Sequence, residues 1–455
     1  MKKVLVILVS FILLSENSYA FGFWFKKRSP TSINSSEKLE YVNLAWWKNF
    51  SDKYLSDYIE RAVKNNHEAK KASLTVNEYR EFVKYQFGQE LPSISTGANY
   101  YGIHLPKTEA KILYRENVFT IPFTADYQAD IFLKNRDKTK SKKKDYEISN
   151  FQEKALYISI ASEVATTYIN IIKYDKQIVL AQRILRVKEE NLDREKSKLA
   201  FGVTTFLKFN ELTKDVETAK ISLNNLYSSR EKALTQFAVL IGESPENIAE
   251  IKRGAFDSFC FCGKIPDVIK SDVIFSRPDV MAEEAKLEKA KIDIRIARKE
   301  LFPTINVSAS YILSNLANQN FFNWNSAIAS VMAGLTQELF KGGMRLANLR
   351  IYKIKYEEMF ENYRQTDLNA VKEVKDSLSF IAQDGKVDSN ANNYLWIQKN
   401  NYKRVSKKYI KGVIGYQVLL NEREKLVTAE SKKTDTRASK LVDYITLYNS
   451  VGGKL

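Results

Sequence analysis

Histidine and cysteine, the side chains that most often bind metals or act as nucleophiles, are scarce in this chain of 455 residues. His67 and His104 are the only histidines, and neither has metal-ligand spacing or a nucleophile beside it. Cys260 and Cys262 are the only cysteines. Two thiolates are too few for a structural zinc site, and a disulfide across one residue would be strained. We therefore predict no metal site and interpret both cysteines as structurally neutral.

Paired acidic residues and paired glycines, which could also take part in chemistry, have simpler explanations. Glu283–Glu284 lies on a polar helix face, where salt bridging is a better interpretation than acid–base catalysis. Gly342–Gly343 lacks the rest of a phosphate-binding loop, so a turn explains it. Ser276-Arg277-Pro278-Asp279 is typical of a helix start. We predict no catalytic residue and no cofactor, and hence no enzyme.

Residues 1–20 predict a secretory signal peptide that is cleaved after Ala20. Lys2 and Lys3 precede an apolar run over 4–14, and small residues end the segment. Eleven apolar residues span only about 16 Å as a helix, roughly half of a bilayer core, which argues against a membrane anchor. The residue directly after the predicted cleavage site is Phe21 and not a cysteine, so we expect no lipid anchor either.

The chain is strongly basic, with a formal charge of +17, or about +16 once Lys2, Lys3 and Glu16 are removed. Export argues against nucleic acid as the partner, so anionic lipid or an acidic protein is the expected one. The basic run Lys138–Lys144 is predicted to lie between a strand and a long helix. It is a candidate for binding lipid headgroups, with a solubilising linker as the alternative. Charged stretches such as Val187–Asn191 are interpreted as solvated helix faces.

Four segments predict membrane-crossing strands. They are residues 93–102, 118–130, 304–313 and 327–338, each close to the nine to eleven residues of a tilted membrane strand. No stretch after the signal peptide has the 18 uninterrupted apolar residues of a spanning helix. Because four strands cannot close a barrel, other copies of the chain must supply the remainder.

Helices are predicted over residues 53–87, 145–199, 279–300 and 345–410, with returning helices that end near Leu240 and Tyr448. Ser51 or Asp52 is placed to cap the first of them. Gly202 and Gly412 would end the two long helices, because glycine accepts the left-handed conformation that stops a helix. The fold class predicted is mainly α with a small β part.

The second half of the chain repeats landmarks of the first at an offset of about 210 residues. Leu91-Pro92-Ser93-Ile94 corresponds to Phe302-Pro303-Thr304-Ile305, and Phe201-Gly202-Val203 to Lys411-Gly412-Val413. A nearly constant offset predicts duplication of one supersecondary unit. We assign the first repeat to residues 21–260 and the second to residues 261–455.

Several motifs resemble those of the outer membrane efflux protein family, the TolC-like exit ducts, and especially the branch that works with resistance-nodulation-division pumps. The motifs are Ser276-Arg277-Pro278-Asp279-Val280, Ala297-Arg298-Lys299-Glu300-Leu301-Phe302-Pro303, Leu339-Phe340-Lys341-Gly342-Gly343 and Leu447-Tyr448-Asn449-Ser450-Val451-Gly452-Gly453. The resemblance implies a homotrimer in which each chain gives four strands to a twelve-stranded outer-membrane barrel above a periplasmic helical tunnel.

The resemblance also implies two functional regions. Docking tips for a periplasmic adaptor would lie at Gly202, Val203 and Thr204 and at Gly412, Val413 and Ile414. A constriction would be formed by Lys208, Tyr409, Val418, Asn421 and Glu424. Ile414 replaces a family arginine, and Val418 and Asn421 replace family aspartates, so we expect a neutral to basic constriction that prefers anions.

The expected function is passive export of small toxic compounds, in complex with an adaptor and an inner-membrane pump. Two alternatives remain open at this point. The chain could be the duct of a type I protein secretion system, or a non-conducting helical spacer.

Overall fold

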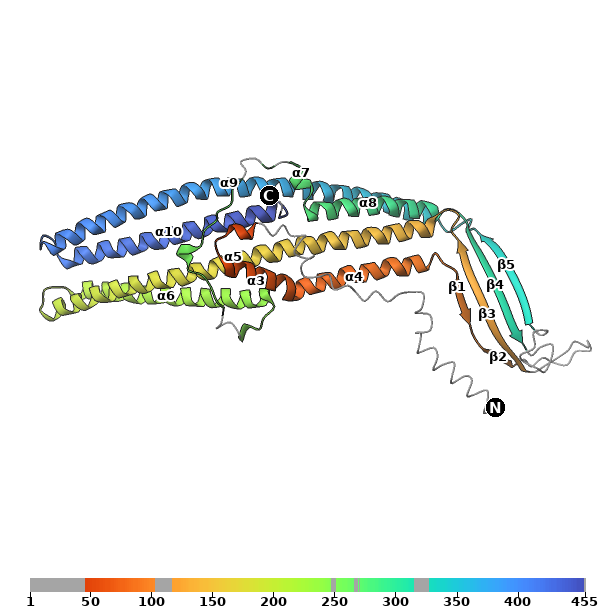
Figure 1. Ribbon diagram of the computed structural model, residues 1–455, viewed down its shortest axis with the longest axis horizontal. Helices are drawn as coiled ribbons and strands as arrows, with labels where there is room; N and C mark the ends of the chain where they lie inside the picture. Colours follow the sequence, from red (N-terminus) through yellow and green to blue (C-terminus); the bar gives the residue numbers. More distant parts are fainter. Residues whose placement is uncertain are drawn as a thin grey trace, which may run out of the picture. The chain divides into compact units, whose positions relative to one another are not determined.

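The computed structural model describes residues 46–102, 117–246, 251–265, 269, 271–314 and 327–453. The predicted signal peptide and His104 lie outside these residues. The described chain is mainly helical with one small sheet, as predicted (Figure 1). Its elements, in chain order, are η2 (Trp47–Asn49), α3 (Lys53–Asn65), α4 (His67–Gly88), β1 (Ser93–Thr96), β2 (Asn99–Gly102), β3 (Asn117–Ala129), α5 (Lys134–Ala200), α6 (Phe206–Ile241), η4 (Phe256–Ser258), α7 (Ser271–Phe275), α8 (Pro278–Lys299), β4 (Thr304–Ser314), β5 (Ala327–Thr336), α9 (Met344–Ile410) and α10 (Tyr416–Ser450).

The first predicted helix is two helices, because Asn66 interrupts it. The Asn66 backbone leaves the helical region at φ −56° and ψ 132°, and its side-chain oxygen accepts hydrogen bonds from the amides of Glu68 and Ala69. Asn66 therefore ends α3 and caps α4. Of the two residues proposed to cap α3, the structure uses Asp52, whose carboxylate accepts from the Tyr54 and Leu55 amides.

The first long helix begins at Lys134, eleven residues before its predicted start. Leu133 precedes it in the left-handed region, with φ 56°, and turns the chain from β3 into α5. The basic run Lys138–Lys144 is consequently helical, and the linker interpretation is wrong. Lys142 pairs with Asp145 at 3.2 Å, and Lys144 pairs with Glu147 at 2.7 Å. These ion pairs thus neutralise part of the positive charge of the run Lys138–Lys144 within the chain.

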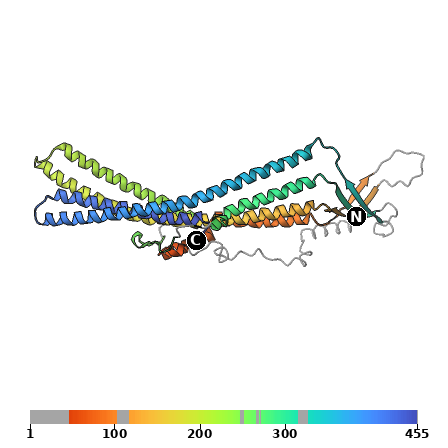
Figure 2. The ribbon, with the colours of Figure 1, turned by 90° about the horizontal axis from the view of Figure 1, so that it is seen from above.

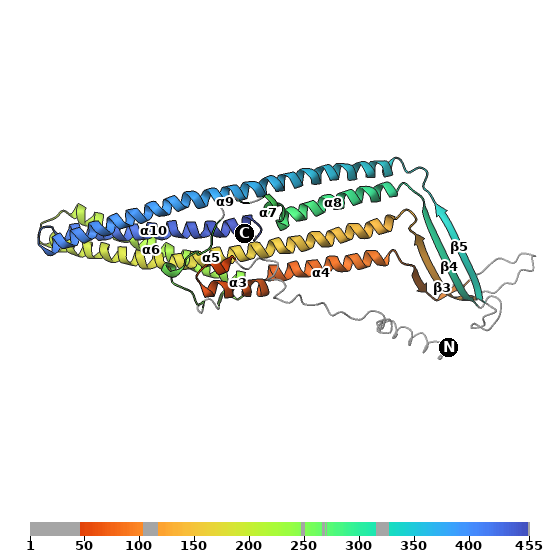
Figure 3. The same cartoon turned by 45° about the horizontal axis from the view of Figure 1, so that its top comes forward.

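Helix α5 is the central packing element, in contact with α4, α6, α8 and α10. It contains an 18-residue window apolar enough to cross a membrane by composition, and 67% of that window is buried inside the fold. Burial of this kind is typical of a core helix. Tyr168 of α5 packs beside Tyr58, Phe237 and Phe259, and all four rings are buried. Figures 1 and 3 show α4, α5, α8 and α9 side by side on the way to the strands.

The strands form one antiparallel sheet in the order β1-β3-β4-β5, and β2 pairs with β3 beyond the end of β1. The predicted strand 93–102 is therefore two short strands. Its break lies opposite Pro122, which has no amide hydrogen to donate to the ladder. Gly97 donates to the Pro122 carbonyl at 3.2 Å across this break.

The helices of the two halves follow one another in the same order, and the long hairpins of the two halves have nearly equal lengths. Helices α5 and α9 each have 67 residues, and α6 and α10 have 36 and 35. A left-handed glycine follows each returning helix: Gly242 lies against Asn65 at the end of α3, and Gly452 lies against Arg277 and Pro278 at the start of α8. A Cβ on Gly242 would lie 2.6 Å from the Asn65 carbonyl oxygen, and one on Gly452 would lie 3.2 Å from Pro278 Cδ.

Asp137 provides a buried ionic link between α5 and α8. Its side chain is only 4% exposed, and its carboxylate lies 2.7 Å from Lys299 Nζ and 3.4 Å from Arg295 Nε. Burial raises the pKa of Asp137, but the hydrogen bond and charge of Lys299, with help from Arg295, outweigh burial and hold the pKa below its usual range. This stabilisation is present above the unfolded pKa of about 3.9 and is lost as the pH falls through the folded value.

Asp137→Asn is expected to destabilise the fold by about 2 kcal/mol, because the uncharged amide loses the charge-assisted hydrogen bond from half-buried Lys299 and the attraction to Arg295. Thermal unfolding at neutral pH measures this effect, which should shrink as the pH falls. Glu81→Gln is the matched control, because Glu81 pairs with Lys84 at 2.6 Å in an exposed position where such pairs contribute about 0–1 kcal/mol. Equal effects of the two changes would contradict the prediction.

Candidate functional site

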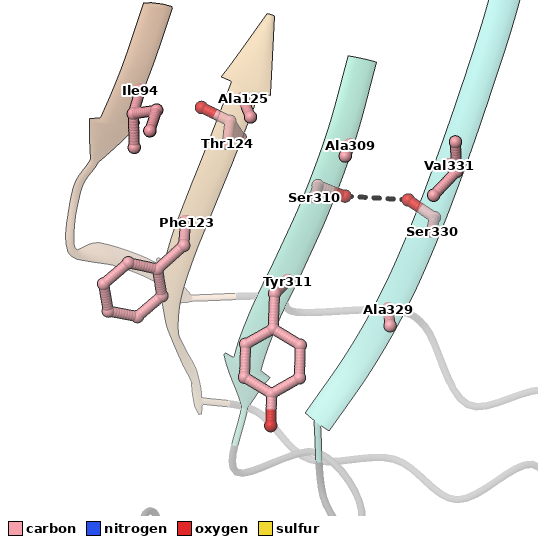
Figure 4. A pocket seen from close by; sticks show the side chains of 10 residues that line it. All are labelled: Ile94, Phe123, Thr124, Ala125, Ala309, Ser310, Tyr311, Ala329, Ser330 and Val331. Atoms are coloured by element: carbon pink, nitrogen blue, oxygen red, sulfur yellow. Dashed lines mark hydrogen bonds between the residues drawn. The ribbon is translucent and has the colours of Figure 1, made fainter.

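The sheet has one apolar and one polar face, and neither is covered by another described element. Paired rows across the strands place Ile94, Ala125, Ala309 and Val331 on one face. The next row, Ser95, Thr124, Ser310 and Ser330, lies on the opposite face. Hydroxyl groups along this second row contact one another, at 2.7 Å for Ser95–Thr124 and for Ser310–Ser330. Figure 4 shows the Ser310–Ser330 contact.

A shallow groove of about 410 Å³ crosses these strands and is lined largely by the apolar row and its aromatic neighbours Phe123 and Tyr311 (Figure 4). Val331 is 79% exposed and Ile94 is 82% exposed. The outer strands β1, β2 and β5 each pair on one side only within the described chain. Such a sheet leaves apolar side chains and two hydrogen-bonding edges without partners, which a soluble monomer avoids.

The two long hairpins, α5–α6 and α9–α10, turn at the end of the helices away from the strands (Figure 2). Both turns have the same backbone conformation and hydrogen bonds. Gly202 and Gly412 are left-handed, with φ 70° and 71°. Val203 donates its amide to the Lys198 carbonyl, and Val413 donates to the Lys408 carbonyl. These are Schellman turns, so the glycine prediction holds at both positions.

Both turns present apolar side chains to solvent. Val203 is 74% exposed and Val413 is 67% exposed, beside exposed Phe201 and Ile410. Thr204 and Ile414 are half-buried, and the Thr204 hydroxyl donates to Glu195. Five exposed basic residues surround the second turn: Lys403, Arg404, Lys407, Lys408 and Lys411. An exposed apolar patch with a basic border is suited to binding a protein partner of opposite charge.

The predicted constriction residues lie within the first turns of α6 and α10 and at the end of α9. Lys208 is exposed and pairs with Glu211 at 2.7 Å, and this hydrogen bond raises the pKa of Lys208. The Tyr409 ring lies 5.2 Å from the Tyr416 ring. Asn421 accepts a hydrogen bond from Gln417, and Val418 is exposed. Among the described residues, no hydrogen bond, ion pair or ring contact joins any two of the five predicted side chains.

A link between the two hairpins was missed by the sequence analysis. The Tyr416 hydroxyl of α10 donates to Glu190 of α5, and the Arg194 guanidinium lies 3.7 Å from the centre of the Tyr416 ring. Arg423 adds a contact to Glu190 at 3.9 Å, and Glu424 pairs with Lys188 at 2.9 Å. The prediction that 187–191 is simply solvated is wrong at Lys188 and Glu190.

No cluster of three or more histidine, cysteine or acidic side chains occurs in the part of the chain that the structure describes. Glu283 pairs with Lys286 at 2.6 Å, which agrees with the salt-bridge interpretation. Gly342 and Gly343 form a left-handed turn before α9. Arg277 of the Ser-Arg-Pro-Asp motif is buried and joins three helices: it donates to the Ser450 carbonyl, Asp279 and Glu373.

Comparisons of the sequence and of the structure with known proteins find efflux proteins and outer-membrane channels. The profile described as "Outer membrane efflux protein" matches residues 58–243 and 271–453. The cation efflux system protein CusC of Escherichia coli K12 is 24% identical over 422 residues, which cover 92% of this chain and 91% of CusC. The toluene efflux pump outer membrane protein TtgF of Pseudomonas putida is 22% identical, covering 90% and 86%. The Campylobacter jejuni CmeC outer membrane channel has the same fold, with a TM-score of 0.82, 20% identity and coverage of 90% and 88%.

Proposed function

The chain belongs to the outer membrane efflux protein family, and we propose that it forms a passive duct that exports small toxic compounds across the outer membrane. The observation that carries this proposal is the two-faced sheet with unpaired edges at one end of long helical hairpins. The family consists of channel proteins, so no chemistry is assigned to the chain. The energy for export would come from its partners.

We propose a homotrimer because the sheet needs partners at both edges. Edge β5 of one copy would pair with β1 and β2 of the next, a head-to-tail contact that closes into a ring. Because β1 and β2 lie one after the other along the same edge of β3, each copy fills four strand positions, and three copies would give a twelve-stranded barrel. The apolar row at Ile94 and Val331 would face lipid, and the hydroxyl row at Ser95 and Ser330 would face water.

The two tips support docking to a periplasmic adaptor, which would connect the duct to an inner-membrane pump. Val203 and Val413 provide exposed apolar contacts, and the lysines around the second tip favour an acidic partner surface. We also propose that the chain is exported through its signal peptide, contacts outer-membrane lipid and has no nucleic-acid partner.

The equal offsets in the two halves support an origin by duplication, with the first repeat over 21–260 and the second over 261–455. Gly242 and Gly452 are 210 residues apart, and each is a left-handed glycine that follows the returning helix of its half. This accounts for two tips per chain. A trimer would then present six similar tips to its adaptor.

We propose that the contacts between the hairpins hold the constriction closed. Adaptor binding at the tips would loosen them and let the helices move apart. Tyr416 is suited to this role because its hydrogen bond to Glu190 raises the pKa of its phenol, which keeps it a neutral donor. Removing Glu190 and Arg194 would release α10 without changing the lining residues Val418 and Asn421.

Glu190→Ala with Arg194→Ala is expected to increase the single-channel conductance of the purified protein. Losing a hydrogen bond to a charged group costs about 1.5–3 kcal/mol, which would shift a closed–open equilibrium about tenfold or more. Glu189→Ala is the matched control, because Glu189 is an exposed neighbour on the same helix. Unchanged conductance in the double variant would contradict the role of this link.

Conductance of the detergent-extracted oligomer in a planar bilayer tests the proposed duct directly. We expect a pore-forming trimer with a small anion preference in a salt gradient, because Val418 and Asn421 supply no acidic ring and Lys208 is partly neutralised by Glu211. Clear cation selectivity would overturn the preference. A protein that extracts without detergent and carries no current would instead support the spacer alternative.

Drug sensitivity distinguishes efflux from protein secretion. A strain without this chain should become hypersensitive to several small compounds and should still secrete its proteins. Loss of one secreted protein with unchanged drug sensitivity would favour the type I secretion duct.

A further inference from the structure

The only two cysteines of the chain lie on a short extended segment whose backbone is fixed on both sides. Phe261 forms an antiparallel bridge with Phe50. Ser51 donates its amide to the Cys260 carbonyl at 3.0 Å, and Cys262 donates to the Asn49 carbonyl at 2.8 Å. The segment after η4 is therefore held as an extended strand against the chain that precedes α3.

Strand geometry places both thiols on the same side of this segment. The Phe261 ring packs against Tyr444 at 4.4 Å and Phe50 at 5.2 Å. Because side chains alternate along an extended chain, Cys260 and Cys262 project from the opposite side. Their Sγ atoms lie 3.4 Å apart, with Ser51 Oγ 3.1 Å from the Cys260 Sγ. Cys262 is exposed and Cys260 is half-buried.

We propose that this dithiol is a binding site for one soft monovalent cation of the Cu(I) or Ag(I) type. Thiolates select such ions over hard cations. Two thiolates are a sufficient ligand set for ions that accept linear two-coordination, and each thiol gives its proton to solvent on binding. The inference goes beyond the proposed duct, because it concerns the segment that pairs with the chain before α3 and needs no pore.

The geometry is compatible with such an ion after a small adjustment. With metal–sulfur distances of about 2.3 Å, two sulfurs on opposite sides of an ion lie about 4.6 Å apart. The thiols must therefore separate by about 1 Å. Cys262 can provide this by rotation of its exposed side chain, while Phe261 remains anchored.

Zinc and a disulfide fit the site less well. Zinc sites take four protein ligands, or three with a water, and no cluster of three candidate ligands occurs among the described residues. A bridge between residues separated by only one position is strained, which favours the dithiol form. Arg437 donates to the Phe259 carbonyl at 2.8 Å and so helps to hold the backbone just before Cys260 in place.

Titration of the purified, reduced full-length protein in detergent tests the proposal. Cu(I) and Ag(I) are added separately under anaerobic conditions, in competition with a chromogenic Cu(I) chelator in the copper arm. We expect one ion bound per chain and an ultraviolet thiolate-to-metal absorption band. Cys260→Ser and Cys262→Ser should each weaken binding by at least about tenfold. Zn(II) should not compete.

Ser258→Ala is the matched control, because Ser258 is exposed just before the same segment and its hydroxyl donates to the Ala255 carbonyl, so both thiols and their contacts are kept and binding should be retained. A thermal unfolding transition like that of the parent protein shows that each variant is folded. The proposal is overturned if the Cys→Ser variants bind as tightly as the parent, if Zn(II) binds as well as Cu(I), or if the cysteines are found as a disulfide in protein isolated without reductant. None of these readouts depends on conductance, so failure here and failure of the duct are separate results.

Discussion

Val331→Arg is expected to abolish the heat-resistant trimer and its insertion into the outer membrane. Val331 lies in the middle of β5 on the apolar face of the sheet and is 79% exposed in the single chain. An arginine facing lipid at the bilayer midplane costs about 2–4 kcal/mol, and three copies in one barrel would raise this to about 6–12 kcal/mol. This cost is comparable to the whole free energy of unfolding of a typical protein, which is about 5–15 kcal/mol.

Ser330→Arg is the control, because Ser330 is the adjacent residue on the opposite face of the same strand. Its hydroxyl contacts Ser310, so the change loses one exposed hydrogen bond and places the charge toward water. Unheated gel electrophoresis of membrane fractions distinguishes the two outcomes. A stable trimer for Val331→Arg and none for Ser330→Arg would reverse the assignment of the faces, and equal behaviour of both variants would argue against a barrel.

Much of the fold could be predicted from local sequence patterns. Alternating residues such as Ile305 and Val307 predict strands, and glycine at 202 and 412 predicts the ends of the long helices, because these signals arise from backbone geometry. The predictions of element boundaries are wrong where a single residue interrupts an otherwise regular helix or strand pattern. Asn66 divides a helix by capping the second part, and Pro122 divides the ladder opposite it.

The candidate site also contains some features that local sequence patterns predict and others that they do not. The tips could be predicted because a turn and its exposed residues are contiguous in the chain. The contacts of Tyr416 with Glu190 and Arg194 could not, because they join residues more than 200 positions apart. Alternation along a strand could have indicated that Cys260 and Cys262 share a side. The backbone hydrogen bonds to Ser51 and Asn49 that hold this segment extended could not be predicted, because they also join residues more than 200 positions apart.

Val203→Asp combined with Val413→Asp is expected to reduce drug resistance to the level of a strain that lacks the chain. Both valines are exposed beside left-handed glycines, and the change leaves the Schellman hydrogen bonds of the backbone intact. Loss of an apolar interface anchor costs about 2 kcal/mol or more, equivalent to about thirtyfold in affinity. An acidic adaptor surface would also be repelled by the new carboxylates.

The matched control is Val203→Leu with Val413→Leu, which keeps apolar side chains at both tips. It should preserve resistance, whereas the aspartate variant should lose it and still form trimers with unchanged conductance. This combination places the defect in docking, since a folding or pore defect would change the oligomer or the current. Full resistance in the aspartate variant would show that the partner binds elsewhere on the helices, and the basic border at Lys407, Lys408 and Lys411 would be the next surface to test.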